Sequence, residues 1–597
     1  MDIHLSHFYG TNHVPSDAEL LEIEKLLAPH NARLSRLEKD LEEAEAKVAR
    51  LKKEKEDVLR VIKPLKSLSS LIRRFPREVM ELIFKHSVPP TAATSPNLSI
   101  FHAPLVLLRV CKLWREIALT TPQLWALVEL TTPPHLCDIY GGNASGAKQQ
   151  QRLALYLEQL DQQLELSESY PLSIVAPPGT GGGTIIRSLS SKVAIHSRRW
   201  EFIDFDASEW RPHPFADIVP EDLPSLKYAR LHAYSSLSNT DPFNTGDNLS
   251  FLGILAAPNL KGLQIQVSRS CNGISKMPVN WTNLTHLSLD GSYMYTHDLS
   301  LQNQQLATEM LPVLNKCQNL RILSLLLIST HDSLSMPEPE AQVTLSKLEA
   351  LNVAGCRLQI HHLLQSIETP RIRQIHYQPF HTSTLPAEEL PFSLAPPLLS
   401  FLERYGNRTE VLSVNLPTVS REDLRSWLEC TPALKQLTLG EEFQFAPPPP
   451  LRTSVSADHE TGLDDSSIGL LTPKQDHPYL CPNLKIFRCS IKTRISVDTM
   501  LAFLKARTDP LLVGSGGIIE EVSVHKLQYD SPFGDSTDAE DEKFESIREA
   551  GVRLSFKKPF YYQSNPDTDM YWPLDSSLLG FGPGYGVDLR LFCIEGK

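Results

Sequence analysis

The sequence lacks the short motifs that mark common enzyme and metal sites. Its 597 residues contain no His-Glu-x-x-His, no Cys-x-x-Cys pair and no Gly-x-Ser-x-Gly. A glycine-rich stretch at 179–183 follows a predicted strand, but a phosphate-binding loop needs a Lys and then a Ser or Thr, and Gly182 and Gly183 stand in those places. The pair His361 and His362 is expected at the surface rather than as a ligand pair. We therefore expect no catalytic residue, no metal site and no cofactor, and no enzyme activity of the chain itself.

Long hydrophobic runs are also absent, and basic residues are in the minority. The longest apolar run, 322–328, is too short to cross a bilayer, and residues 1–7 lack the basic and apolar segments of a secretory signal. The 58 Lys and Arg are outnumbered by 70 Asp and Glu, giving a net charge of −12. Since phosphate binding needs clustered positive charge, nucleic acid is not the expected main partner.

Cysteine is scarce and unpatterned. The nine cysteines are scattered, and only Cys481 and Cys489 lie close together in the sequence. Cys317, Cys430 and Cys481 stand just before predicted strands, where small buried residues are expected. Reduced thiols are the simplest explanation, which predicts a location in the cytoplasm, the nucleus or both, and no role at a membrane.

What the N-terminal part does contain is a heptad pattern between residues 20 and 65. Glu, Lys and Arg fill most other sites, which is typical of a coiled coil. Pro29 and His30 interrupt the pattern, so the strongest part is 31–62, and Pro64 is expected to end the helix. The stretch could pair with a second chain, fold as a hairpin, or pack against the helices that follow. The a positions are Leu20, Leu27, Leu34, Leu41, Val48, Lys55 and Ile62, and the d positions are Ile23, His30, Leu37, Ala44, Leu51, Val58 and Leu65.

Three short helices are predicted between Phe75 and Leu127. Pro76 suits the first turn of one helix, and Thr121 with Pro122 forms an N-cap and first-turn pair for the third. The second helix is expected to bury one stripe, with spacing i, i+3, i+4, i+7 and i+11. That stripe consists of Leu107, Val110, Cys111, Trp114 and Ala118.

The joint pattern resembles the F-box, with its closest similarity to F-box proteins that are numerous in mushroom-forming fungi. It combines a proline-started helix, Val-Cys-Lys-x-Trp-Arg-x-Ile-Ala at 110–118, and Thr-Pro-x-Leu-Trp at 121–125. Two departures are Phe75 in place of the family's Leu, and a first inter-helix loop lengthened by four prolines within 88–104.

The resemblance implies docking to the Skp-type adaptor of a cullin-RING ubiquitin ligase and, through the adaptor, to a cullin. The open alternative is that Trp114 and its neighbours only fill a core against the next domain. The residues that the resemblance assigns to adaptor binding are Phe75, Pro76, Val79, Met80, Ile83, Phe84, Leu107, Val110, Cys111, Trp114, Ile117, Leu124 and Trp125.

The C-terminal region repeats the pattern Leu-x-x-Leu-x-Leu, which a proline precedes by two residues in the copies that begin at Leu226, Leu260, Ile372, Leu434 and Leu484. Clear copies begin their leucines at Leu260, Leu284, Leu320 and Leu348, and weaker copies continue to residue 487. Each copy predicts a turn feeding a short strand, with residues 200–205 as a first, irregular strand and helices at 306–316 and 421–429 between strands. Successive copies from Leu260 to Leu348 begin 24, 36 and 28 residues apart, close to the roughly 20–29 residues of leucine-rich repeats with insertions. This predicts a degenerate α/β solenoid with its curved strand face as a binding surface.

We therefore expect a multi-domain chain. An N-terminal helix or coiled coil (1–66) precedes an F-box (67–130), a linker (131–150) and a leucine-rich-repeat-like solenoid (151–597) with an inserted mobile loop at 446–477. Residues 535–545 are expected to be solvated surface, and residues 561–592 to cap the last repeat. The predicted function is substrate recognition in an SCF-type ligase, with the solenoid binding an unknown protein target and with self-association possible through 31–62. The alternative is a coiled-coil and repeat scaffold with no ligase role.

Overall fold

The computed structural model describes residues 14–69, 71–87, 104–130, 146–176, 183–206, 215, 217–233, 253–267, 274–291, 307–327, 342–380, 397–414, 421–440, 463–474, 479–489, 493–513, 517–525 and 544–557. The chain divides into two compact units, residues 1–83 and 84–597. The glycine-rich stretch 179–182, the four prolines at 447–450 and the residues 561–592 lie outside the described ranges.

The first unit consists mainly of one long helix, α1 (Asp17–Leu68), followed by the short 3-10 turn η2 (Leu71–Arg74) and the start of α2 (Arg77–Ser87). Ser16 caps α1: its hydroxyl oxygen accepts a hydrogen bond from the Glu19 N–H at 3.5 Å, and its own N–H donates to the Glu19 carboxylate at 2.8 Å. The helix continues through Pro29. We predicted from the sequence that it ends at Pro64, but it ends one turn later, at Leu68. Proline lacks the N–H that would bond the carbonyl four residues earlier, and the helix ends one turn after Pro64.

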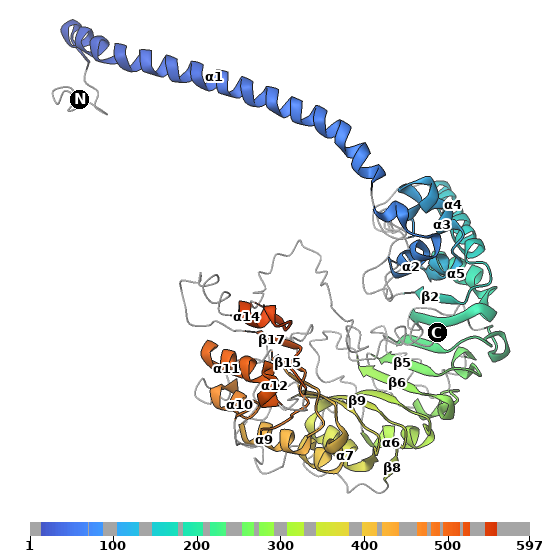
Figure 1. Ribbon diagram of the computed structural model, residues 1–597. Helices are drawn as coiled ribbons and strands as arrows, with labels where there is room; N and C mark the ends of the chain where they lie inside the picture. The colour runs from blue at the N-terminus through green and yellow to red at the C-terminus, as the bar shows by residue number, and fades with distance from the viewer. Residues whose placement is uncertain are drawn as a thin grey trace. The chain divides into compact units, whose positions relative to one another are not determined.

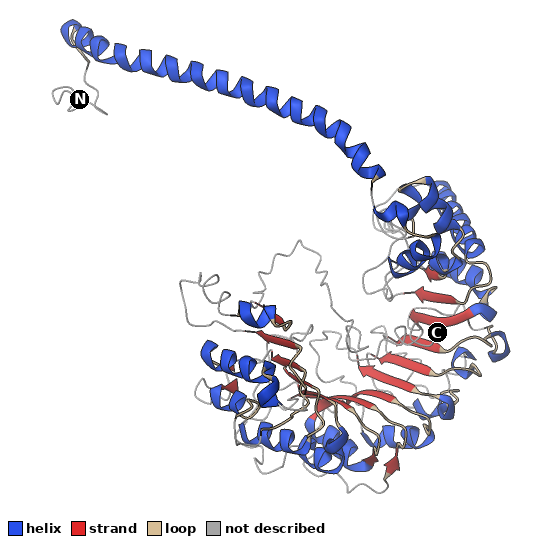
Figure 2. Ribbon diagram, in the orientation of Figure 1, coloured by secondary structure: helices blue, strands red, loops and turns tan. Residues whose placement is uncertain are grey.

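The second unit is built on a parallel sheet of fourteen strands among the described residues, shown with its helices in Figures 1 and 2. The strands of this sheet pair in chain order. Two small two-stranded sheets lie apart from it: β8 (Val343–Thr344) pairs with β10 (Ile367–Glu368), and β14 (Leu463–Asp464) pairs with β16 (Thr493–Arg494). The large sheet contains β1 (Leu127–Glu129), β2 (Leu172–Ala176), β3 (Trp200–Asp206), β4 (Tyr228–Ala233), β5 (Gly262–Val267), β6 (His286–Gly291), β7 (Ile322–Leu327), β9 (Ala350–Cys356), β11 (Gln374–Phe380), β12 (Val411–Val414), β13 (Gln436–Leu439), β15 (Ile486–Cys489), β17 (Glu521–His525) and β18 (Arg553–Lys557).

Helices connect many of these strands, as parallel pairing requires a crossover. They lie along the outer side of the arched sheet in Figure 2. Those between strands of the large sheet are α4 (Gly146–Leu166), α5 (Gly183–Ala194), α6 (Ala307–Lys316), α7 (Arg357–Ser366), α8 (Pro397–Tyr405), α9 (Arg421–Cys430), α10 (Asp465–Gly469), α11 (Val497–Thr508), α12 (Pro510–Val513) and α14 (Glu545–Glu549). The predicted helices at 306–316 and 421–429 are confirmed within one residue as α6 and α9.

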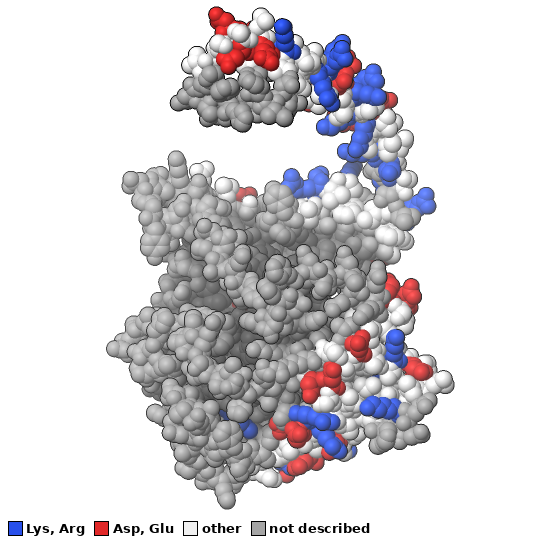
Figure 3. Space-filling view, turned by 90° about the vertical axis from the view of Figure 1, so that its left-hand side faces the viewer, with Lys and Arg blue, Asp and Glu red and all other residues white. Residues whose placement is uncertain are grey.

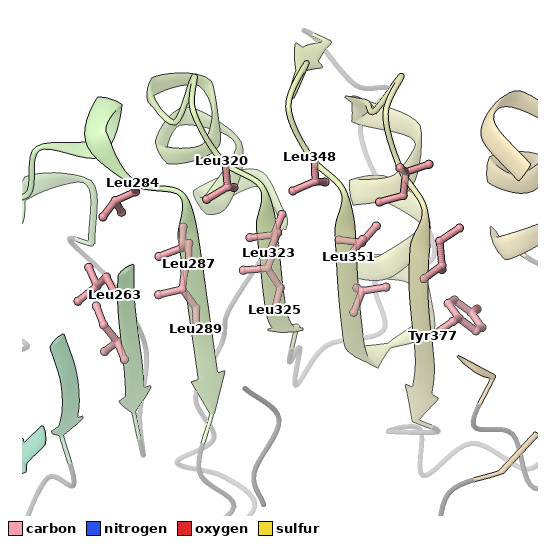
Figure 4. Packing of buried hydrophobic residues seen from close by; sticks show 14 of the residues in the cluster. Leu263, Leu284, Leu287, Leu289, Leu320, Leu323, Leu325, Leu348, Leu351 and Tyr377 are labelled. Carbon is pink, nitrogen blue, oxygen red and sulfur yellow. The ribbon is translucent and has the colours of Figure 1, made fainter. Parts of the chain in front are cut away.

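The repeated leucines form the core, as the pattern predicted. Figure 4 shows them stacked from strand to strand, with one residue before each strand and two within it. The registers place Leu263 beside Leu287, and Leu323 beside Leu351. All of these side chains have zero exposure. Each strand alone could bury only one face, so stacking neighbours is what creates a continuous core.

Asparagines before the first leucine of a copy tie successive copies together. The side-chain amide of Asn283 donates to the Pro258 carbonyl at 3.0 Å, and that of Asn319 donates to the Thr282 carbonyl at 2.8 Å. Asn259 makes the same bond to the copy before it. The turn at each copy leaves a backbone carbonyl without a strand partner, and the asparagine satisfies it.

Charged residues that directly follow the first core residue of a copy form ion pairs between neighbouring copies. Arg321 bonds Glu349 at 2.7 Å, and Glu410 accepts from both Arg373 and Lys435. These ion pairs are exposed, so each contributes less than about 1 kcal/mol to stability, but together they favour the observed order of neighbouring copies.

Several predicted boundaries move. Strands β1 and β2 precede residues 200–205, so β3 is not the first strand, and α4 begins inside the predicted linker at residue 146. The predicted loop 446–477 includes β14 (Leu463–Asp464) and α10, with Leu463 and Ile468 in the core. Hydrophobic residues there were hidden by the flanking Ser- and Asp-rich composition, which had predicted a mobile loop.

Candidate partner-binding surfaces

Helix α2 divides its apolar side chains between two faces. Met80 and Phe84, four residues apart, are 2% and 1% exposed, whereas Val79 and Ile83 are each 40% exposed. Leu82 adds a third exposed side chain at 54%. Adjacent residues on a helix point about 100° apart, and in α2 the pair Met80 and Phe84 faces the core while Val79 and Ile83 face away from it.

The predicted second helix is broken in two. A 3-10 turn, η3 (Leu107–Arg109), is followed by α3 (Lys112–Leu119), with Cys111 as the N-cap in extended conformation. The Cys111 sulfur accepts a hydrogen bond from the Trp114 N–H, and the Arg115 side chain donates to the Leu108 carbonyl. The predicted continuous stripe is therefore wrong: Leu107 and Ala118 are buried, Trp114 is half-buried, and Val110 and Cys111 are exposed.

The third predicted helix is the 3-10 turn η4 (Pro122–Trp125), with Pro122 in the first turn as expected. Thr121 stands at the N-cap but does not cap with its side chain; its hydroxyl donates to the Ile117 carbonyl at 2.7 Å instead. The Trp125 indole N–H donates to the Ala118 carbonyl at 2.9 Å. These two bonds fix η4 against α3.

Residue Gln163 of α4 joins η4 to the sheet. Its side-chain amide donates to the Leu127 carbonyl at 2.7 Å and to the Trp125 carbonyl at 3.3 Å, and Gln163 is buried. Strand β1 then begins at Leu127, directly after η4, and pairs with β2. The segment α3–η4 is therefore packed continuously onto the first strands of the sheet.

The thirteen residues assigned to adaptor binding separate into two groups. Six are buried and support the segment rather than offering a contact surface: Met80, Phe84, Leu107, Ile117, Leu124 and Trp125. Trp114 is half-buried, with its ring 4.9 Å from that of Phe84 in an edge-on arrangement. The exposed ones are Phe75, Pro76, Val79, Ile83, Val110 and Cys111.

Three exposed apolar residues were missed by the sequence reasoning. Leu82 lies on α2, while Leu113 and Leu119 lie on α3 and are 51% and 39% exposed. Their signal was present, because Leu82 is three residues after Val79, and neighbours at that spacing share a helix face. Exposed large apolar side chains in such number on two short helices are unusual unless a partner covers them.

Most strands of the large sheet carry one polar residue between their two core residues, and these residues form a row along the strand face; β2 has Val175 at this position. In the middle of the sheet the row is uncharged and buried, at Ser288, Ser324, Ser413 and Thr438. Towards the ends it includes charged residues: Arg230 pairs with Asp204 at 3.3 Å, and Arg488 pairs at 2.6 Å with Glu521, which stands at the start of β17 outside the row. Ser288, Ser324, Ser413 and Thr438 are therefore not themselves exposed, and the use of the strand face as a binding surface stays a prediction.

Two histidines on the strand face are held neutral by burial. Burial lowers the pKa of His376 to about 4. Burial, and then the positive charge of Arg321, lower the pKa of His286 to about 4 as well. Both side chains are less than a tenth exposed, so neither can take up a proton without losing its buried position or bringing in water.

We expect the second unit to lose stability as the pH falls below about 6.5. An unfolded histidine binds a proton near pH 6.5, whereas these two resist it to about pH 4, so acid favours the unfolded chain between these values. At pH 5 the loss is about 2 kcal/mol for each histidine. Urea unfolding at pH 7.5 and pH 5 measures it, and His376→Gln should reduce the loss of stability between these pH values by about 2 kcal/mol. An equal pH dependence in wild type and variant would contradict this assignment.

The remaining candidates from the sequence do not form a chemical site. His361 and His362 lie inside α7 rather than at its start, and His362 is buried instead of exposed. Burial raises the pKa of Cys317 and Cys481 to about 12, so both are thiols rather than nucleophilic thiolates. In the described part of the chain, no group of three His, Cys, Asp or Glu side chains is placed to hold a metal ion, and no helix is long and apolar enough to span a bilayer.

Cys111, Cys317, Cys430, Cys481 and Cys489 are free of disulfides. Cys111 is exposed, which departs from the expectation of buried thiols, because it caps α3 from the outside.

No family model matches the sequence, and no curated protein matches it either.

Proposed function

We propose that this chain is the substrate-recognition subunit of an SCF-type ubiquitin ligase. In this proposal the segment 75–127 is an F-box that binds a Skp-type adaptor, and the adaptor links the chain to a cullin. The α/β region is a leucine-rich-repeat-like solenoid that binds a protein target. Ubiquitin transfer belongs to the partner subunits, and this chain contributes the proximity of target and transfer machinery.

The observation that carries the proposal is the set of exposed apolar side chains on α2 and around α3. Val79, Leu82 and Ile83 share one face of α2, and Val110 and Leu113 flank the start of α3. A partner that covered these side chains would remove apolar surface from water, which favours binding by about 25 cal/mol for each Å² buried. The F-box resemblance supplies a partner for which such a surface is expected.

A second observation supports the division of labour. Gln163 and the start of β1 hold η4 against the sheet, so the segment α3–η4 and the first strands form a single packed body. A receptor must hold its target at a fixed distance from the ligase. A packed junction provides that geometry, whereas a flexible linker would not.

Charged substitutions on the exposed positions test the proposal by co-purification with a fungal Skp-type adaptor. We expect Ile83→Asp with Val110→Asp to reduce adaptor capture at least about 100-fold, since burying two uncompensated carboxylates costs several kcal/mol. Both side chains are exposed in the free chain, so folding should be unaffected. Circular dichroism and the urea midpoint check this.

Leu511→Asp is the matched control. Leu511 is 92% exposed and belongs to α12, so the same change of chemistry there should leave adaptor capture at the wild-type level. Equal capture of adaptor by wild type and by the double variant would contradict the proposed surface. Capture of none by wild type would leave the alternative, a repeat scaffold with no ligase role.

A further inference from the structure

Helix α1 exposes a continuous apolar stripe along its length. The stripe consists of the predicted a and d positions, of which Leu34, Leu37, Leu41, Val48 and Leu51 are between 49% and 61% exposed. The helix is unbroken from Asp17 to Leu68, which rules out a hairpin within this stretch. At a rise of about 1.5 Å per residue, α1 is about 78 Å long. A seam of this length that its own chain leaves exposed can be buried by a second α1.

The charges of α1 are divided between its two halves. Residues 17–45 contain nine acidic and four basic residues, and residues 46–68 contain three acidic and eight basic residues. Figure 3 shows acidic side chains gathered at one end of the helix and basic ones along the rest. Two parallel copies would place halves of like charge together. Two antiparallel copies place the acidic half of each helix beside the basic half of the other.

The two polar positions in the seam select one antiparallel alignment. In an antiparallel pair each a position faces a d position of the other helix. When the pair is centred between residues 42 and 43, Lys55 faces His30 of the second copy, and every other layer is apolar. The layers are then 20 with 65, 27 with 58, 34 with 51, 41 with 44, 48 with 37, 55 with 30 and 62 with 23. A parallel pair in register would instead place Lys55 against Lys55, and shifting the antiparallel pair by one heptad would place Lys55 against a leucine or isoleucine.

The residues that flank the seam agree with the same alignment. In it, Arg33 faces Glu54 of the second copy and Asp40 faces Lys47, each pair occurring twice by symmetry, against one repulsive combination, Glu38 with Glu45. In the parallel pair only Arg33 with Glu38 attracts. The parallel arrangement also opposes Glu19 to Glu24, Asp40 to Glu45 and Lys47 to Lys52. Such flanking pairs set orientation in coiled coils.

We propose that two copies of this chain associate through an antiparallel coiled coil of their α1 helices, centred between residues 42 and 43. The proposal does not depend on the proposed ligase function. Since α1 leads into the rest of the chain at its C-terminal end, antiparallel pairing sends the two copies of the rest of the chain away from opposite ends of the coiled coil.

Sedimentation equilibrium of the full chain, with two charge reversals, tests both the dimer and its direction. Glu54→Arg places a second positive charge opposite Arg33 only in the antiparallel pair, because in the parallel pair residue 54 faces Leu59. We expect this variant to raise the dimer dissociation constant about tenfold. Arg33→Glu should weaken the dimer similarly. An equimolar mixture of the two variants should recover wild-type association, because each charge then meets its opposite.

Glu42→Arg is the matched control, since position 42 faces outward in either arrangement, and it should leave the dissociation constant unchanged. A wild-type chain that stays monomeric across the measured concentrations would overturn the proposal. So would a dimer that Glu54→Arg leaves unchanged, or one that mixing fails to restore, because these are the results expected of a parallel pair. Circular dichroism of each variant confirms that α1 remains helical.

Discussion

Replacing Arg507 with methionine is expected to lower the free energy of unfolding of the second unit by about 4 kcal/mol. Arg507 of α11 is completely buried. Its guanidinium donates to the carbonyls of Leu471, Leu480 and Cys481 at 2.8–3.0 Å, and lies 4.8 Å from the centre of the Tyr479 ring. Burial lowers its pKa to about 10, so it stays protonated at neutral pH.

The size of this effect follows from the three buried carbonyls that the guanidinium hydrogen-bonds. It closes the chain between α10 and β15, where carbonyls point into the core without strand partners, and a thioether cannot donate to them. Hydrogen bonds from a charged donor contribute more than neutral ones, and unpaired buried carbonyls carry a further cost. Urea unfolding followed by tryptophan fluorescence measures the change.

Lys505→Met is the control for Arg507→Met, because Lys505 lies two residues earlier on the same helix and is exposed. It should change the free energy by less than about 0.5 kcal/mol. A loss for Arg507→Met as small as that of the control would contradict the role assigned to the buried guanidinium.

Gly355→Ala is expected to cost more than about 3 kcal/mol, or to prevent folding of the second unit. Gly355 in β9 has a φ of +123°, and a Cβ there would lie 1.9 Å from the Leu327 carbonyl oxygen of the neighbouring β7. Backbone atoms in paired strands cannot move aside without breaking the ladder. The same position must therefore satisfy two conditions that only glycine meets.

Gly469→Ala provides the contrast. Gly469 ends α10, has no positive φ, and would place a Cβ in open space. There alanine should be neutral or stabilise by up to about 1 kcal/mol, since it loses less conformational freedom on folding. Comparable thermal midpoints for the two alanine variants would show that the glycine in β9 is not required.

The sequence predicted the repeating part of the fold well, because its signal is local. Each Leu-x-x-Leu-x-Leu copy contains its own turn and its own buried residues, so Leu284, Leu287 and Leu289 could be assigned without knowing their neighbours. The same holds for α1, whose apolar period is visible in the sequence alone. The edges were harder: β1 is three residues long and has no leucine pattern of its own.

Non-local packing explains what the sequence could not predict. Apolar period alone made Val110 and Leu107 equivalent, yet the break at Cys111 turns one outward and buries the other. Nothing in the spacing around Arg507 indicated that an arginine would enter the core, because its carbonyl partners are 26 to 36 residues away. Similarly, Met80 is buried and Val79 exposed because of the face of α2 that packs against other residues, and the sequence of α2 alone does not show which face that is.

Adaptor-dependent recruitment of a cullin is the most direct test of the proposed ligase function. The purified full chain, a fungal Skp-type adaptor and the N-terminal part of the matching cullin would be mixed and resolved by size-exclusion chromatography, with and without the adaptor. We predict that all three components elute together, and that the chain and the cullin elute separately when the adaptor is left out. Separate elution of the chain in the complete mixture, or cullin binding that needs no adaptor, would contradict the assignment of the segment 75–127 as an F-box.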